Sequence, residues 1–171
     1  MAIKINAAAR LKATAKIFYR GLQETWNESK AKNQHLTFVT EDRDYALEYA
    51  KDEDHLLSFH VDVRHPFDFG FRTLTTSVSL SEVVARIRKG IMSQFQSGHV
   101  SKEKGLALIE RLKSVDQPGH KEVWEWYMKV PELSAILQEA GYDCIKGNEG
   151  AGDDIVTYGV FDPHKLKPIR N

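Results

Sequence analysis

The chain has 171 residues, of which 42% are hydrophobic, enough for a single domain with a sizeable core. Lysine plus arginine and aspartate plus glutamate both number 24, so the formal net charge is zero, which argues against a generally basic nucleic-acid binder. The single cysteine excludes an internal disulfide. The N-terminus lacks the apolar segment of a signal peptide, and no apolar run is long enough to cross a bilayer, so we expect a cytoplasmic protein without a membrane partner.

The N-terminal part of the chain is predicted to form short strands around one helix. In chain order we expect a helix at 7–15, strands at 17–20 and 36–39, a helix at 42–51 and a strand at 56–63 that Pro66 ends. Thr40 is placed to cap the second helix. Tyr45 and Tyr49 are four residues apart on that helix and share one face. We predict that one of them faces a cleft and the other packs in the core.

The middle of the chain is predicted to be helical. Ser79 to Glu82 is a capping-box pattern ahead of Val83, Val84, Ile87 and Ile91 at helical spacing. Further helices are expected at 101–113, with Leu106, Ile109 and Leu112 inside, at 122–128, and from Pro131 to Gly141. We predict that this helical insertion, about 79–140, selects a partner and contributes no chemistry. Trp124 and Trp126 face different sides of their helix, and we expect one of them to be exposed as a contact residue.

The C-terminal part is predicted to form a β-hairpin. Two β-type runs, 144–146 and 155–161, flank a turn that is rich in glycine and acidic residues. Asp162-Pro163 ends the second run, because proline cannot continue a ladder. With strands at both ends and helices between them, we expect an α+β fold in which residues 1–171 form one domain.

The metal-binding and nucleophilic residue types form no convincing cluster in the sequence. His55, His60 and His65 are spaced by five residues, which suits neither a helical face nor a strand face, so we expect no metal site. Cys144 is interpreted as a small buried hydrophobe on a strand, although a nucleophilic pair with a histidine stays open.

An ordered set of segments carries a family resemblance, although each segment alone is weak. The segments are Phe18–Gly21, Thr37–Ala50, Phe59–Asp68, Gly141–Ile145 and Tyr158–Ile169. Together they resemble the ADP-ribosyltransferase domain of phage polyvalent proteins and of related phage and bacterial toxins. The resemblance covers about 17–67 and 141–169, and the helical middle is the part that varies in such domains. It implies a split β-sheet around an NAD cleft.

The resemblance also implies how NAD is bound as a substrate. Arg20 would hold the ribose or the diphosphate by charge-assisted bonds, and the backbone beside Gly21 would approach the nicotinamide carboxamide. Thr40 would brace the site, and Tyr49, or else Tyr45, would pack on the nicotinamide ring. The implied NAD-binding set is Tyr19, Arg20, Gly21, Thr40, Tyr45 and Tyr49.

One position departs from the family pattern. Thr157 stands where the family places its acid, and threonine cannot supply the charge that stabilises an oxocarbenium-like transition state. Asp153 matches Thr157 in strand parity, whereas Asp154 and Glu149 lie in the expected turn; we favour Asp154 narrowly. With such a carboxylate, the resemblance implies mono-ADP-ribosylation of a host or phage macromolecule, a protein rather than a nucleic acid. Without one it implies a catalytically inactive module that binds a partner protein. NAD glycohydrolase activity is a third possibility.

Overall fold

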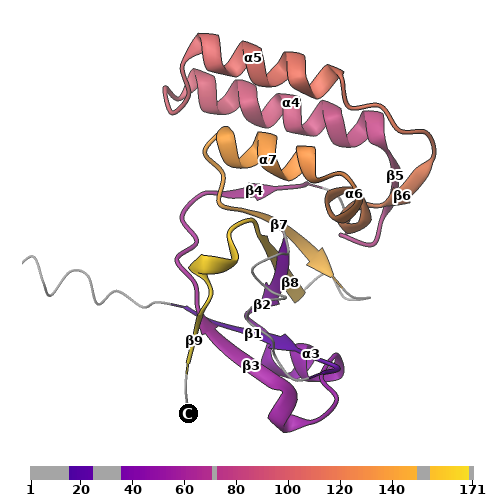
Figure 1. Ribbon diagram of the computed structural model, residues 1–171, viewed down its shortest axis with the longest axis vertical. Coiled ribbons are helices and arrows are strands. Elements are labelled where there is room, and N and C mark those ends of the chain that lie inside the picture. The colour runs from indigo at the N-terminus through magenta and orange to yellow at the C-terminus, as the bar shows by residue number, and fades with distance from the viewer. Residues whose placement is uncertain (1–15, 25–35, 71–72, 150–154, 170–171) are drawn as a thin grey trace, which may run out of the picture.

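The computed structural model describes residues 16–24, 36–70, 73–149 and 155–169 (Figure 1). The strands are β1 (Ile17–Gly21), β2 (Thr37–Thr40), β3 (Leu56–His60), β4 (Pro66–Asp68), β5 (Ser77–Ser79), β6 (His120–Glu122), β7 (Cys144–Glu149), β8 (Ile155–Val160) and β9 (Lys167–Pro168). The α-helices are α3 (Arg43–Glu48), α4 (Leu80–Gln96), α5 (Lys102–Lys113), α6 (Val123–Lys129) and α7 (Pro131–Glu139), and 3-10 turns cover Glu53–His55 and Pro163–Lys165. The α+β prediction is therefore confirmed, whereas the helix predicted at 7–15 lies outside the described residues.

Most of the described strands join one mixed sheet with the order β4-β7-β8-β2-β1-β3-β9, in which only the β4–β7 pair is parallel. β1 pairs with β3 along its whole length, from Ile17 opposite His60 to Gly21 opposite Leu56. By contrast, β1 pairs with β2 only where Tyr19 lies opposite Thr40. The sheet is thus narrowly joined between β1 and β2.

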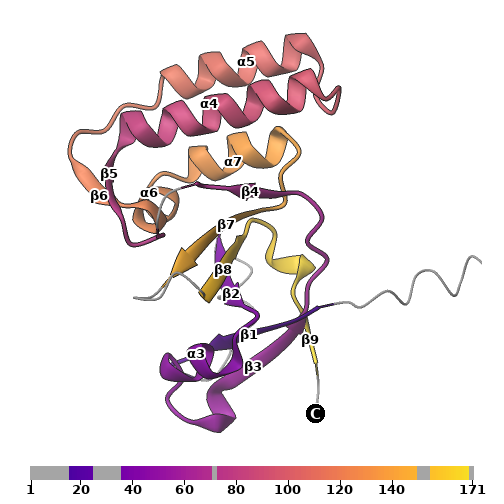
Figure 2. The same cartoon turned by 180° about the vertical axis from the view of Figure 1, so that it is seen from behind.

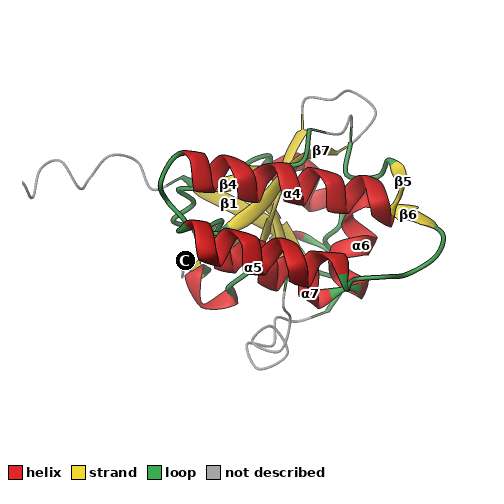
Figure 3. Cartoon of the chain, turned by 90° about the horizontal axis from the view of Figure 1, so that it is seen from above, coloured by secondary structure: helices red, strands yellow, loops and turns green. Residues whose placement is uncertain are grey.

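The helical layer, which we define as α4 to α7, packs at the end of the sheet that carries β4 and β7 (Figures 1 and 2). Figure 3 shows α4 and α5 lying side by side across the top of the molecule. A single apolar core joins this layer to the sheet, since residues of α4, α5, α6 and α7 share one buried cluster with sheet and loop residues such as Leu36, Phe67, Ile145 and Phe161. A smaller cluster around Phe59 lies at the β1–β3 side. Within the described residues, no helix is long and apolar enough to cross a membrane.

Helix α4 begins as the sequence predicts. The Ser79 hydroxyl accepts from the backbone amide of Glu82, and the Glu82 carboxylate accepts in return from the Ser79 amide. The buried residues of α4 include Val83, Ile87 and Ile91. The fourth predicted helix, α7, is followed by Gly141 with φ of 96°, the left-handed conformation that favours glycine after a helix.

Three local predictions are wrong. Asp42, and not Thr40, caps α3, because its carboxylate accepts from the Tyr45 amide. Leu106 is 53% exposed, and Leu108 is buried in its place, because α5 packs against α4 and α7 through another face. Pro66 does not end the sheet pairing but opens β4, a short edge strand whose first residue needs no donor.

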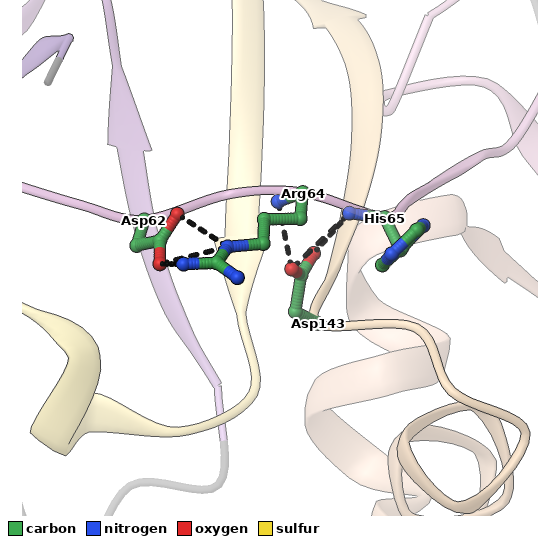
Figure 4. A network of polar contacts seen from close by, with 4 residues as sticks. All are labelled: Asp62, Arg64, His65 and Asp143. Carbon is green, nitrogen blue, oxygen red and sulfur yellow. Dashed lines mark hydrogen bonds and ion pairs between the residues drawn. The ribbon is translucent and has the colours of Figure 1, made fainter. Parts of the chain in front are cut away.

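The parallel β4–β7 pair is anchored by the Asp143 carboxylate, just before β7 (Figure 4). This carboxylate accepts from the backbone amides of Arg64 at 2.8 Å and His65 at 3.2 Å. The Arg64 guanidinium turns away and pairs with Asp62. The segment that crosses from β3 to β4 is therefore tied to the residue just before β7. These two parts of the chain are far apart in sequence.

Candidate functional site

A cavity of about 360 Å³ lies over the narrow junction of β1 and β2. Its size suits a small-molecule site. The lining residues are Tyr19, Arg20 and Gly21 from β1, Phe38, Val39 and Thr40 from β2, Tyr45, Ala46 and Tyr49 from α3 and its C-terminal end, Glu149 from β7, Thr157 from β8, and Thr75 and Trp124 from the helical side. All six residues of the implied NAD-binding set therefore meet in one place, from segments far apart in the chain.

Helix α3 packs closely against β1 because Gly21 has no side chain. A Cβ atom there would lie 2.1 Å from the Ala46 carbonyl oxygen and 2.5 Å from the Ala50 amide nitrogen, distances that real contacts do not reach. The backbone amide of Lys51 also donates to the Leu22 carbonyl. The structure thus gives Gly21 a packing role: it lets α3 approach β1 and form a wall of the cavity.

Arg20 contributes a positive charge that is largely withdrawn from water. Its Nη1 atom is buried and has no hydrogen-bond partner among the described residues. Burial lowers the pKa of the Arg20 guanidinium. A buried donor without a partner is costly for the free protein. Because this donor belongs to a residue that lines the cavity, an anionic or oxygen-rich ligand could satisfy it.

Glu149 places a carboxylate beside Thr157. Gly147 lies opposite Thr157 in the β7–β8 ladder, so Glu149, two residues along β7, is its diagonal neighbour on the same face. The Thr157 hydroxyl donates to Glu149 Oε2 at 2.7 Å. The sequence places Glu149 in the turn, but β7 extends to this residue, so the carboxylate is carried on a strand.

Two tyrosines continue this polar chain from α3. The Tyr45 hydroxyl donates to Glu149 Oε2 at 3.4 Å and lies 2.8 Å from the Tyr49 hydroxyl. Burial, followed by the bond to Tyr49 and the nearby Glu149 charge, raises the pKa of Tyr45 well above its ordinary value, so it stays a neutral donor. The chain Tyr49–Tyr45–Glu149–Thr157 thus fixes one carboxylate at the wall of the cavity.

The expected division of roles between the two tyrosines is wrong. Tyr45 and Tyr49 both line the cavity, and their rings meet edge to face with centroids 5.2 Å apart. Tyr49 is 54% exposed and Tyr45 is half-buried, so neither ring packs in the core. The short helix α3 lies along the cavity and presents both rings to it.

Thr40 connects the elements around the cavity, although it does not cap α3. Its hydroxyl donates to the Val156 carbonyl on β8 at 2.9 Å and accepts from the Asp42 amide at 3.1 Å. One side chain therefore ties β2 to β8 and fixes the chain where α3 begins. The role in NAD binding that the resemblance implies for Thr40 stays a prediction.

Of the three candidate acids, only Glu149 can be placed. Asp153 and Asp154 lie outside the described residues. Sequence reasoning missed Phe38, Thr75 and Trp124 as cavity residues. Phe38 belongs to a predicted strand, and Trp124 is one of two tryptophans of which one is expected to be exposed, but nothing in the local sequence indicates that either side chain reaches this cavity.

Cys144 and the histidines are the remaining candidates from the sequence. Cys144 is fully buried in the smaller apolar cluster, and burial together with the adjacent Asp143 raises the pKa of its thiol, which agrees with a small buried hydrophobe. In the part of the chain that the structure describes, no group of three or more histidine, cysteine, aspartate and glutamate residues is arranged to hold a metal ion.

Comparisons of the chain with protein-family models, with curated proteins and with solved structures find no match.

Proposed function

We propose that this protein is an NAD-dependent mono-ADP-ribosyltransferase that modifies a host or phage protein. The observation that carries the proposal is the meeting of Arg20, the Tyr45–Tyr49 pair and the Glu149 carboxylate in one cavity. These groups supply a cation for a phosphate or ribose, aromatic surface for a planar ring, and a negative charge for a cationic transition state. The sequence resemblance connects the first and second of these features with NAD.

The residues present fit NAD as a substrate. The orphaned Nη1 atom of Arg20 can donate to an oxygen of the diphosphate or of a ribose. The rings of Tyr45 and Tyr49 offer an apolar and polarizable wall to the nicotinamide. The narrow β1–β2 junction under the cavity is also what a sheet split around a ligand cleft requires. We therefore assign the cavity to the nicotinamide end of NAD.

The chemistry of the proposed reaction asks for one well-held carboxylate. The bond between C1′ of the ribose and the nicotinamide nitrogen breaks, and nicotinamide leaves as a neutral molecule with the bonding electrons. Positive charge develops on the ribose, and an acceptor nucleophile forms the new bond to C1′ and loses its proton. In this proposal Glu149 stabilises that charge and orients the acceptor, and its hydrogen bonds from Thr157 and Tyr45 support the assignment.

Incubation of the purified protein with adenylate-labelled NAD and a bacterial lysate tests the proposal. We expect label on protein and release of free nicotinamide. Nicotinamide release without labelled protein would replace transfer with NAD hydrolysis. NAD binding without turnover in every lysate would favour the inactive binding module, for which the uncharged Thr157 is the supporting observation. If no NAD binding is measured, the proposal is wrong.

A further inference from the structure

The helical layer reaches the cavity through Trp124, on α6, together with Thr75 from the segment before β5. The sequence predicts that this layer contributes only to partner choice. The tyrosines of α3 approach the cavity from the β1–β2 side, whereas the segment that carries Trp124 is fixed to β7. In the sheet, β8 and β2 lie between β7 and β1. The cavity is therefore lined by aromatic residues both from the α3 side and from the helical layer.

Main-chain hydrogen bonds hold Trp124 close to β7, the strand that carries Glu149. The Trp124 amide donates to the Leu74 carbonyl at 3.2 Å, and the Leu74 amide donates to the Asn148 carbonyl at 2.7 Å. Asn148 directly precedes Glu149. Gly147 permits this approach, because a Cβ atom there would lie 2.6 Å from the Leu74 side chain. Trp124 is thus tied to β7 next to the proposed catalytic carboxylate.

The two tryptophans of α6 have different environments. Trp126 is fully buried, and its indole nitrogen donates to the Val78 carbonyl at 2.9 Å, as expected of a core residue. Trp124 is only half-buried, and its indole nitrogen donates to Glu122 Oε2 at 2.5 Å. Since that donor is already used within the protein, Trp124 offers the cavity the apolar surface of its ring.

We propose that Trp124 is a ligand-binding residue whose indole packs against a planar ring of bound NAD. This inference rests on the proposed function, because it takes NAD as the ligand. The nicotinamide ring is planar, and the cavity that we assign to that end of NAD is lined by Trp124 as well as by Tyr45 and Tyr49. The helical layer then supplies part of the binding site as well as most of the apolar core.

Tryptophan fluorescence and calorimetry with NAD test the inference. Base–aromatic stacking predicts that Trp124→Ala weakens NAD binding by about five- to hundredfold, and that Trp124→Phe restores most of the affinity. NAD should quench the emission of the wild type, and Trp124→Phe should lose most of this quench while it still binds. Trp126→Phe is the matched control, because Trp126 is fully buried and does not line the cavity, and it should keep the quench.

The two failures can be distinguished. If the wild type does not bind NAD, the proposed function fails and the inference fails with it. If the wild type binds NAD, but Trp124→Ala binds with equal affinity or Trp124→Phe shows an undiminished quench, the role of Trp124 is wrong and the proposed function stands. A lowered melting temperature of Trp124→Ala with unchanged affinity would likewise assign Trp124 to folding alone.

Discussion

The helical layer and the cavity differ in how their residues are used. In the helical layer, large apolar side chains such as Trp126, Leu133 and Ile136 are fully buried, and α4 has both bonds of its capping box. At the cavity, β1 and β2 share a single register pair, and Arg20 has a buried nitrogen without a hydrogen-bond partner among the described residues. The first arrangement stabilises the fold, whereas the second leaves interactions open for a ligand.

This contrast shows where stability and function separate in a single domain. Unsatisfied buried polar groups cost free energy, and they persist when packing elsewhere compensates. The common core that joins the helical layer to the sheet provides that compensation. Changes in the helical core should therefore affect unfolding, and changes at the cavity should affect the ligand.

The largest expected effect is on turnover at Glu149. Replacing Glu149 by glutamine removes the charge but keeps the size and the acceptor oxygen for Thr157. Loss of a preorganised electrostatic group costs roughly 3–4 kcal/mol, or about a hundred- to thousandfold in rate. We expect NAD turnover to fall by this factor at an unchanged melting temperature. The matched variants Asp153→Asn and Asp154→Asn should keep turnover. Loss of turnover in either one, with Glu149→Gln active, would assign the catalytic role to that aspartate instead.

A substitution in the helical core should have the opposite result: it should lower stability and leave NAD affinity unchanged. Leu133, on α7, is fully buried and does not line the cavity. Leu133→Ala should lower the free energy of unfolding by about 3 kcal/mol, measured by urea denaturation, because it removes buried apolar volume and leaves a cavity. NAD affinity of the folded variant should stay within about twofold of the wild type. Leu106→Ala, at an exposed position on α5, is the control and should change stability by less than about 0.5 kcal/mol. A large loss of NAD affinity in Leu133→Ala would show that the two regions are coupled.

The features that the sequence predicts correctly are those that depend on residues close together in the chain. The capping box at Ser79 and the helical spacing through Ile91 are local, and the structure has both. The sequence also predicts the hairpin, and β7 pairs with β8 in the antiparallel direction. Spacing alone did not decide which face of α5 packs inward, so Leu106 was assigned to the core where Leu108 is buried.

The features that the sequence misses depend on residues far apart in the chain. The parallel pairing of β4 with β7 joins Pro66 to Cys144, and nothing near Pro66 indicates it. Trp124 reaches the cavity only because the Leu74 backbone docks on β7. The six cavity residues of the implied NAD-binding set could be grouped in advance only from the resemblance, not from local patterns. The bond between Glu149 and Thr157 required the register of the hairpin.

Arg20 should show opposite effects on binding and stability. Arg20→Met removes a buried donor that has no partner in the part of the chain that the structure describes, and it keeps much of the apolar stem. We therefore expect the free energy of unfolding to stay equal or to rise. NAD affinity should fall by about ten- to hundredfold, because a charge-assisted hydrogen bond contributes about 1.5–3 kcal/mol. Calorimetry and urea denaturation measure the two quantities. Arg43→Met, on α3, removes an exposed arginine that pairs with Glu53 and should leave NAD affinity unchanged. Destabilisation of Arg20→Met with unchanged affinity would give Arg20 a structural role.

The smallest expected effect lies in the helical layer, at the cap of α4. Hydrogen bonds from the Ser79 amide and hydroxyl lower the pKa of Glu82 from its ordinary value of 4.5. Because the folded pKa lies below the unfolded one, this contribution to stability is present above about pH 4.5 and is lost as the pH falls through the folded pKa. We therefore expect Glu82→Gln to lose less of its melting temperature than the wild type between about pH 5 and pH 3. Asp116→Asn, at an exposed loop position, is the control and should follow the wild-type curve. Identical pH dependence in Glu82→Gln and the wild type would show that the capping carboxylate does not couple to folding.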